Sequence, residues 1–220
     1  IEKALASLRK KVDLVAFGES YLQGFNSLKW NFERDRTVAV SVDSQPIKML
    51  RYTAKKYSVA VSFGYYELCD EAIYSSYMFI GKNGEIVNNF RRVSKGWKEY
   101  DITDEHYKEG DGFKTFTYMG KRIALAVCGD LWYEENIEQI NKEKFDFLLY
   151  PVYVTYNTEM WRTKLVNEYA EQAKKIPRPV FLVNSICDAD NTRGGCYAFL
   201  NGKTVCEVPM GQDGYLLVRV

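Results

Sequence analysis

Short apolar runs alternate with amphipathic stretches along the chain, and their two periodicities predict strands and helices. Helical spacing of apolar residues predicts helices at residues 1–11, 46–57, 134–144 and 159–175. Apolar and β-branched runs predict strands at residues 12–17, 59–66, 74–80, 85–93, 114–118, 122–128, 145–150, 180–186 and 215–220. Glycine-containing turns predict hairpins at residues 81–84, 119–121 and 201–203.

Strands and helices alternate in part of the chain, whereas hairpins join successive strands elsewhere. This mixture predicts mixed sheets that are covered by helices. The 220 residues contain no internal repeat, low-complexity tract or linker, so we predict a single α+β domain over residues 1–220. Because the chain begins at Ile1, inside a predicted helix and without a methionine, we also expect a strand that precedes it.

Composition narrows the class of protein. Hydrophobic residues make up 46% of the chain and charged residues 27%, which is typical of soluble globular proteins. The 30 basic residues nearly balance the 29 acidic ones, and a net charge of +1 gives no electrostatic reason to bind nucleic acid or an anionic membrane. No apolar stretch reaches the length of a membrane span, and the start does not resemble a signal peptide.

Cysteine and histidine usage limits the possible chemistry. The five cysteines are odd in number, scattered and without a Cys-x-x-Cys pair: Cys69, Cys128, Cys187, Cys196 and Cys206. This pattern argues against a disulfide framework and a structural zinc site, and it favours the reducing cytoplasm. The only histidine, His106, lies among charged residues, so a zinc site built on several histidines is excluded. We expect no metal, and an activated cysteine would need a partner other than histidine.

Cys128 ends the apolar run 123–128 and is followed at once by Gly129 and Asp130. A thiol held at a strand end and presented to a cleft has the placement that a nucleophile needs. The alternative is an inert core thiol, because free cysteine is often buried. We expect the short side chain of Asp130 to orient the turn by accepting backbone hydrogen bonds.

Two other strand ends carry groups that complement a thiol. Glu19 follows the predicted strand 12–17, and a basic turn follows the predicted strand 85–93. If these strands are neighbours in the fold, a carboxylate, an ammonium and a thiol meet. The carboxylate would take the thiol proton, the thiolate would attack a carbonyl carbon, and the cation would stabilise the oxyanion. Such a set catalyses acyl transfer.

Several segments follow one another in a characteristic order: residues 17–25 around Glu19, 107–110, 122–135 around Cys128, 169–172, 180–184, and Gly194 with Gly195. In this order and spacing they resemble the nitrilase superfamily of carbon–nitrogen hydrolases, over essentially the whole chain. The resemblance implies a four-layer αββα sandwich with two mixed β-sheets, a Glu–Lys–Cys triad and no cofactor. It implies that Glu19 is the general base and Cys128 the nucleophile.

The position of the triad lysine departs from the family pattern. A literal alignment places Arg92 there, and arginine can bind an oxyanion but has too high a pKa to give a proton to a leaving amine. We therefore choose Lys95, displaced by one turn or a bulge, with Lys98 as the alternative. The competing interpretation is that all these cations belong to a solvated loop.

The family also has a second glutamate near the lysine. Glu105 is our candidate, with Asp104 beside it as the alternative, and a plain loop charge explains Glu105 almost as well. Glu135 has an equivalent in the family pattern. Aromatic residues on segments that flank the family's cleft could shape a substrate pocket or simply fill the core: Trp132, Tyr133, Tyr153, Tyr156 and Trp161.

The sequence thus predicts a cofactor-free thiol hydrolase that cleaves a carbon–nitrogen bond other than a peptide bond, in an amide or an N-carbamoyl group, through a Cys128 thioester. The alternatives are a nitrile hydrolase, an acyltransferase that uses the same thioester, and a non-catalytic binding or scaffold protein with a nitrilase-like fold. The resemblance also implies a homodimer or higher homo-oligomer. The identity of the substrate is beyond the sequence, because loops build the pocket.

Overall fold

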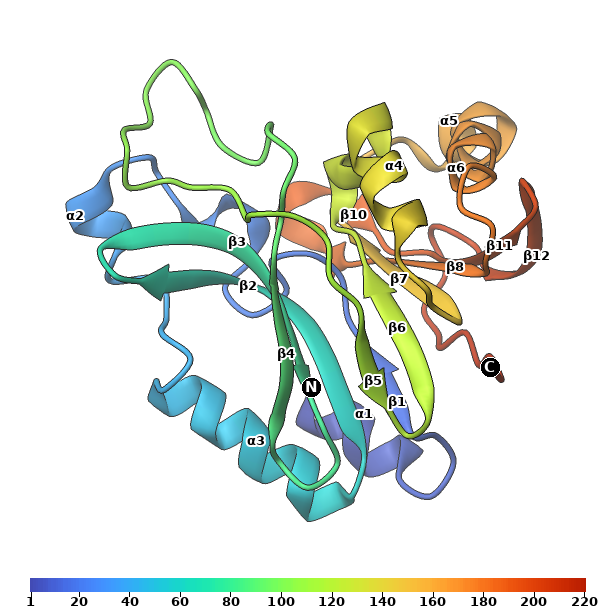
Figure 1. Ribbon diagram of the computed structural model, residues 1–220, viewed down its shortest axis with the longest axis horizontal. Coiled ribbons are helices and arrows are strands. Elements are labelled where there is room, and N and C mark those ends of the chain that lie inside the picture. The colour runs from blue at the N-terminus through green and yellow to red at the C-terminus, as the bar shows by residue number, and fades with distance from the viewer. The chain divides into compact units, whose positions relative to one another are not determined.

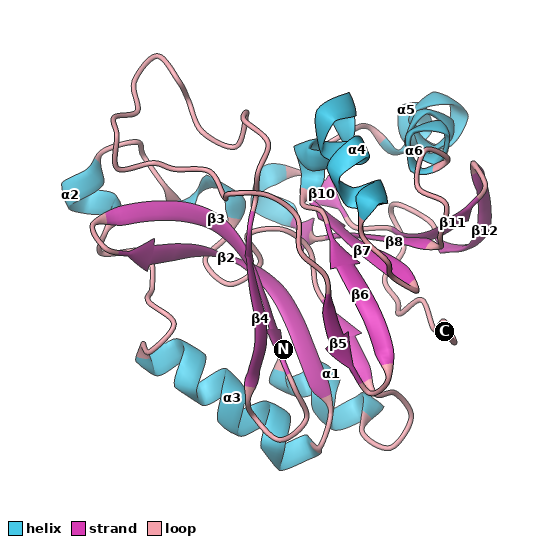
Figure 2. Cartoon of the chain, viewed as in Figure 1, coloured by secondary structure: helices cyan, strands magenta, loops and turns pink.

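The computed structural model describes residues 1–220 and divides into two compact units, Ile1–Asp111 (unit 1) and Gly112–Val220 (unit 2). Each unit contains one main β-sheet and its own helices (Figures 1 and 2). Both main sheets combine parallel and antiparallel pairs. This confirms the predicted α+β class with two mixed β-sheets, and each unit is described below by itself.

Unit 1 has a four-stranded sheet in the order β1-β2-β3-β4. Its strands are β1 (Leu14–Ala16), β2 (Ala60–Cys69), β3 (Ala72–Ile80) and β4 (Ile86–Arg91). Its helices are α1 (Glu2–Leu8), the 3₁₀ turn η1 (Phe25–Ser27), α2 (Phe32–Asp35) and α3 (Gln45–Tyr57). Strand β1 runs parallel to β2, and the other pairs are antiparallel. Ala16, at the carboxyl end of β1, pairs with Ser62, so the residues that follow β1 lie beside Gly64 of β2.

Helices α1 and α3 supply the apolar side chains that cover one face of this sheet. Leu5 of α1 and Ile47 of α3 are fully buried in one apolar cluster with Val61 and Phe63 of β2. Helix α3 begins with a proline in its first turn, where the missing N–H costs no hydrogen bond, and it ends at Ser58 in the left-handed conformation. The sequence pattern of residues 46–57 thus predicted α3 within one residue.

Unit 2 has a six-stranded sheet in the order β12-β11-β8-β7-β6-β5. The strands are β5 (Phe116–Tyr118), β6 (Lys121–Leu125), β7 (Phe147–Val152), β8 (Val180–Asn184), β11 (Cys196–Leu200) and β12 (Lys203–Val208). A separate pair is β9 (Ile186–Cys187) with β10 (Thr192–Arg193), joined by the 3₁₀ turn η4 (Asp188–Asp190). The helical segments are η2 (Cys128–Trp132), α4 (Glu134–Lys142), α5 (Thr158–Met160), the π-helical turn η3 (Trp161–Leu165) and α6 (Val166–Ala173).

Strands β6, β7 and β8 are parallel, so their carboxyl ends share one edge of the unit 2 sheet. Every residue of β7 is buried, as expected for a central strand that is covered on both faces. Ile137 and Ile140 of α4 and Tyr169 of α6 pack on this sheet in the main apolar cluster of unit 2. No helix of the chain combines the length and the hydropathy that are needed to cross a lipid bilayer.

The predicted final strand, residues 215–220, is wrong. Residues 212–220 have no regular secondary structure, although the run is apolar. Tyr215, Leu217 and Val218 are exposed, and no neighbouring strand pairs with this segment. A strand is stable only when its backbone groups find a ladder partner, which an apolar pattern by itself does not supply.

Candidate active site

Cys128 lies directly beyond the buried end of β6. Ala126 and Val127 continue the apolar run of that strand and are almost fully buried, whereas Cys128 is partly buried. Its backbone φ is +46°, in the left-handed region that residues other than glycine rarely adopt. Such strain persists only where surrounding contacts impose it, and it is concentrated at functional sites. The strand therefore ends in a sharp turn that has the thiol at its first residue.

Asp130 stabilises this turn. Its Oδ2 accepts a 2.8 Å hydrogen bond from the Val127 amide, and its own amide donates to the Val127 carbonyl at 3.0 Å. Asn136 in α4 donates from Nδ2 to the Asp130 carbonyl at 3.1 Å. Asp130 is fully buried. These contacts confirm the prediction that Asp130 orients the turn by accepting backbone hydrogen bonds.

Tyr150 of β7 holds the other side of the same turn. Its hydroxyl donates a 2.7 Å hydrogen bond to the carbonyl oxygen of Cys128. Burial raises the pKa of Tyr150 well above its ordinary value, so the hydroxyl keeps its proton and remains a donor. The sequence analysis missed this residue, because a tyrosine within a buried strand has no signal that distinguishes it from core packing.

In unit 1, Glu19 follows β1 in a turn that rests on Gly64 of β2. The Gly64 amide donates to the Gly18 carbonyl at 3.0 Å, and the Leu22 amide donates to the Gly64 carbonyl at 3.1 Å. A Cβ at position 64 would lie 2.3 Å from the Ser20 nitrogen and 2.6 Å from the Glu19 Cα. Only glycine allows this approach, and it sets the backbone that presents the Glu19 carboxylate.

The Glu19 carboxylate forms a buried ion pair with Arg92, the residue that follows β4. Nη1 of Arg92 lies 2.8 Å from Oε1 of Glu19, and both side chains are nearly inaccessible to solvent. Nε of Arg92 donates to the Ser94 hydroxyl at 2.9 Å, and the Ser75 hydroxyl donates to Oε1 of Glu19 at 3.5 Å. The Arg92 amide donates to the Ser75 carbonyl at 2.9 Å, which places residue 92 opposite β3.

The two lysines considered from the sequence lie elsewhere. The Lys95 side chain is exposed, and only its carbonyl contributes to the cluster, by accepting from Nη2 of Arg92 at 3.4 Å. Nζ of Lys98 pairs with Glu109 at 3.0 Å and donates to the Tyr107 carbonyl. The structure therefore places Arg92, and not Lys95, beside Glu19. Locally, the Ser94 hydroxyl and the Lys95 carbonyl bind the Arg92 guanidinium, whereas the Lys95 side chain is exposed to solvent.

The candidates for a second carboxylate are not brought to this ion pair. Glu105 is exposed and makes no hydrogen bond with Glu19 or Arg92. Oδ1 of Asp104 accepts from the His106 amide at 3.0 Å and lies 2.9 Å from the His106 ring nitrogen. Both carboxylates lie in an exposed turn. The backbone bridge between Ile73 and Tyr107 joins the end of this turn to β3.

The aromatic candidates divide into two groups. Trp161 is buried and packs against Tyr169 and Tyr197, with ring centroids 4.9 and 5.5 Å apart, so it belongs to the core. The Tyr153 hydroxyl bonds to Asp190 in η4. The remaining three are exposed: Trp132, Tyr133 and Tyr156. Glu135, in the first turn of α4, is also exposed.

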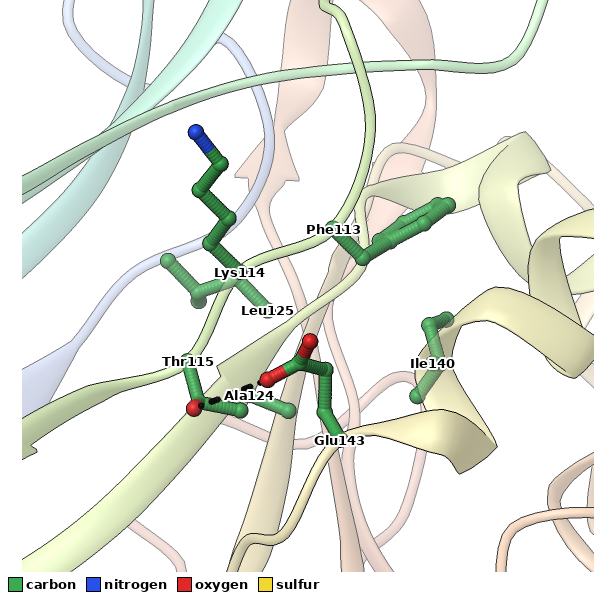
Figure 3. A pocket seen from close by; sticks show the side chains of 7 residues that line it. All are labelled: Phe113, Lys114, Thr115, Ala124, Leu125, Ile140 and Glu143. Carbon is green, nitrogen blue, oxygen red and sulfur yellow. Dashed lines mark hydrogen bonds between the residues drawn. The ribbon is translucent and has the colours of Figure 1, made fainter.

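A hollow in unit 2 is lined by none of the candidate site residues. Figure 3 shows it between β6, α4 and the segment before β5, with Phe113 and Ile140 on one side and Thr115 bonded to Glu143 at 3.4 Å. It has no room for a water molecule, so it is a packing defect rather than a substrate site. Nowhere in residues 1–220 do three or more histidine, cysteine or acidic side chains gather as a metal site requires.

Comparison with known proteins relates this geometry to a family. The family model described as carbon–nitrogen hydrolase matches residues 1–220. A cyanide hydratase of Gibberella zeae is 22% identical over 185 residues, which cover 78% of this chain and 51% of that protein. The chain thus spans about half the length of the curated relatives that it matches.

Two solved structures share the fold. A carbon–nitrogen hydrolase from Helicobacter pylori G27 superposes with a TM-score of 0.71 at 15% identity, covering 96% of this chain and 78% of that one. A mutant amidase from Nesterenkonia sp. AN1, with an acetamide moiety covalently added at its active-site cysteine, gives a TM-score of 0.71 at 14% identity, covering 95% and 78%. At these identities the likeness shows the fold, an α+β sandwich.

Proposed function

The chain belongs to the carbon–nitrogen hydrolase family, and we propose that it hydrolyses a carbon–nitrogen bond other than a peptide bond, in an amide or an N-carbamoyl group. One observation carries the proposal more than any other. Cys128 ends a buried strand in a left-handed turn that Asp130 and Tyr150 hold by hydrogen bonds. This is how a nucleophile is presented, and an inert core thiol needs no such strain.

The proposed reaction has two halves. Glu19 takes the proton of the Cys128 thiol, and the thiolate attacks the carbonyl carbon to form a tetrahedral intermediate. The carbon–nitrogen bond then breaks, and the nitrogen leaves as ammonia or an amine with the proton that Glu19 returns. Water attacks the resulting thioester and gives a proton to Glu19. The carbon–sulfur bond breaks, and the sulfur recovers its proton as the acid is released.

Arg92 is our candidate for the cation of this site, because it lies against Glu19. A guanidinium binds an oxyanion well but does not release a proton near neutral pH. The proton that reaches the leaving nitrogen must then come from Glu19. Lys95 remains the alternative cation that the sequence predicts, and Glu105 the alternative second carboxylate.

The comparisons support cysteine chemistry in a protein of the same fold. The active-site cysteine of the Nesterenkonia amidase carries the acetamide moiety of fluoroacetamide in a glutamate-to-glutamine mutant. An acyl or alkyl group on sulfur is the kind of adduct that a thiol nucleophile forms. We extend to Cys128 the role of nucleophile, and to Glu19 the role of the proton-transferring glutamate.

The test is a panel of simple amides and N-carbamoyl compounds with ammonia release as the readout. We expect turnover by the wild-type protein, loss of turnover in Cys128→Ala and in Glu19→Gln, and a thioester on Cys128 in the mass spectrum of quenched reactions. Far-ultraviolet circular dichroism of both variants should match the wild type. Turnover that survives in Cys128→Ala would contradict the mechanism.

A second candidate function is a non-catalytic binding protein that keeps the fold. The observation that favours it is the arginine at the position where the family has its lysine. An acyltransferase is a third possibility, in which another acceptor replaces water at the same thioester. A thioester that forms but decays only when an amine or hydroxylamine is added would identify the acyltransferase. Absence of any thioester across the panel would favour the binding protein.

We further propose that the protein forms a homodimer or a higher homo-oligomer and works in the cytoplasm, with a small-molecule substrate as its only other partner. The oligomer follows from the family resemblance, and the compartment follows from five scattered cysteines with no pairing pattern. Light scattering after size-exclusion chromatography measures the first. A monomer at micromolar concentration would contradict it.

A further inference from the structure

A cleft in unit 1 opens between two turns that lead from a helix into a strand. It is lined by residues 9–13, which join α1 to β1, and by residues 56–58, at the end of α3. Its volume is about 450 Å³, within the range of sites that bind small molecules. Strands β1 and β2 are parallel, so both turns lie at the amino ends of this pair, whereas Glu19 follows the carboxyl end of β1. The cleft is therefore separate from Glu19.

Positive charge dominates this cleft. Four of the side chains that line it are cationic and one is acidic: Arg9, Lys10, Lys11 and Lys56, against Asp13. Lys56 is already paired, since its Nζ lies 3.0 Å from Oε1 of Glu2. The whole chain has a net charge of only +1, so these cations are a local concentration of charge. An excess of cations around a concave surface attracts anions to it.

The three consecutive cations, residues 9–11, have no partner within the protein. Their side chains are exposed, form no ion pair and donate no hydrogen bond. Cations near helix carboxyl ends often offset the helix dipole, which is the alternative explanation. Here, however, backbone amides already bind the carbonyls that end both helices. The Leu8 carbonyl accepts from the Lys11 amide at 2.9 Å, and the Ala54 carbonyl accepts from the Val59 amide at 3.2 Å. The side chains of residues 9–11 thus remain available to a ligand.

We propose that this cleft binds a small anion that carries two or more phosphate groups. The guanidinium of Arg9 offers a fork of donors that matches phosphate oxygens, and the ammonium groups of Lys10 and Lys11 supply compact charges. A ligand with one negative charge leaves most of this positive charge without a counterion, whereas two or three phosphate groups contact different cations at once. The site is additional to the proposed hydrolase activity and does not depend on it.

An anionic lipid surface offers the same phosphate chemistry, but the shape of the cleft favours a soluble ligand. A bilayer surface is broad and contacts side chains that protrude, whereas these residues surround a hollow. Proteins that bind in the plane of a membrane also insert large apolar side chains. The two apolar or aromatic residues of the lining, Val12 and Tyr57, are both partly buried.

The experiment is isothermal titration calorimetry at low ionic strength, with orthophosphate, pyrophosphate and inorganic triphosphate as the probes. The test variant is Arg9→Gln/Lys10→Gln/Lys11→Gln, which replaces exposed side chains and should leave the fold intact. Asp13→Asn is a second variant, which removes the only carboxylate of the lining. Co-sedimentation with vesicles of phosphatidylcholine and phosphatidylserine tests a lipid as the source of the phosphate.

The matched control is Lys121→Gln/Arg122→Gln/Lys144→Gln. It removes the same charges, one guanidinium and two ammonium groups, from exposed residues of unit 2 that do not line the cleft. The net charge of the chain therefore falls equally in the two triple variants, and only the test variant changes the cleft.

We expect the affinity to rise with the number of phosphate groups and to fall as salt is added. Each exposed cation should contribute about two- to fivefold, so the test variant should bind triphosphate about 10- to 100-fold more weakly than the wild type. The control should bind it as the wild type does. Asp13→Asn should bind triphosphate about two- to fivefold more tightly, because a repelling charge is lost.

Three outcomes would overturn the proposal. The first is the absence of binding heat when wild-type protein is titrated with triphosphate. The second is an equal loss of affinity in the two triple variants, which would assign the binding to net charge. The third is binding to the vesicles without binding to triphosphate, which would assign these cations to a membrane surface. Because the measurement needs no turnover, its result is independent of the proposed function.

Discussion

The Arg92 guanidinium lies 2.8 Å from the Glu19 carboxylate, in a contact between residues 73 positions apart, and both side chains are buried. The guanidinium also donates from Nε to the Ser94 hydroxyl, and the Ser75 hydroxyl donates to Oε1 of Glu19. Removing one partner of a buried ion pair leaves the other charge buried without a partner. This lowers the free energy of unfolding far more than the loss of a surface ion pair does. The contact therefore links stability and the proposed chemistry in unit 1.

Replacing Arg92 with methionine should lower the free energy of unfolding by about 3–5 kcal/mol, because Glu19 remains buried and unpaired. Arg92→Lys keeps the charge but not the fork of donors, so a smaller loss is expected. Urea titration measures both. Lys95→Met is the control, since its exposed side chain should contribute little to stability. Equal losses in Arg92→Met and Lys95→Met would contradict this interpretation of the ion pair.

The same three variants decide which cation serves the reaction. If Arg92 binds the oxyanion, Arg92→Met abolishes turnover on the amide panel, whereas Lys95→Met remains active. The reverse result would restore Lys95 as the triad cation. Activity per folded molecule, with the folded fraction taken from the urea curves, keeps the comparison free of stability effects.

The thiols should differ in reactivity with iodoacetamide. Burial raises the pKa of the Cys196 thiol to about 11, so it stays protonated and unreactive from pH 7 to 9 and reacts only as the pH approaches that value. Cys128, presented at a turn and paired with a base in the proposed mechanism, should be labelled first at pH 7. Peptide mass mapping after short exposure measures each site. Exposed Cys206 gives the rate of an ordinary accessible thiol.

Tyr150→Phe removes the hydrogen bond to the Cys128 carbonyl and keeps the ring in the core. We expect a loss of about 1 kcal/mol in unfolding free energy. Because the turn at Cys128 is strained, we also expect a larger effect on kcat than on KM. Tyr65→Phe is the comparison variant, because it removes the 2.9 Å hydrogen bond that the hydroxyl of buried Tyr65 donates to Oδ1 of Asn89 in unit 1. A kcat that falls equally in both variants would point to general destabilisation.

Gly64→Ala should displace the Glu19 turn. The added Cβ would meet backbone atoms of Ser20 and Glu19 at 2.3 and 2.6 Å, and backbone has little freedom to move. We expect a loss of about 1–3 kcal/mol in stability together with a large loss of turnover. Gly214→Ala is the matched control, because its Cβ would first meet a Val208 methyl at 3.3 Å, which a small side-chain shift relieves. Normal activity in Gly64→Ala would show that the turn tolerates movement.

The sequence by itself determined the local features of this protein. The periodicity of apolar residues predicted α3 and most of the strands, because burial of one face imposes that spacing on any helix or strand. The position of Cys128 at a strand end and the turn role of Asp130 were also readable, because both depend on neighbours only a few residues away. The ordered motifs indicated the family, which the whole-chain match then showed.

Tertiary structure alone decided which distant side chains meet. Arg92 rather than Lys95 lies at Glu19, Tyr150 bonds the Cys128 carbonyl, and Gly64 shapes the turn below Glu19. The apolar run at residues 215–220 did not become a strand, because strand formation needs a partner that the run cannot supply. Local spacing constrains what a segment can become, but a contact between residues far apart depends on sheet register and on competition among side chains, which no single segment contains.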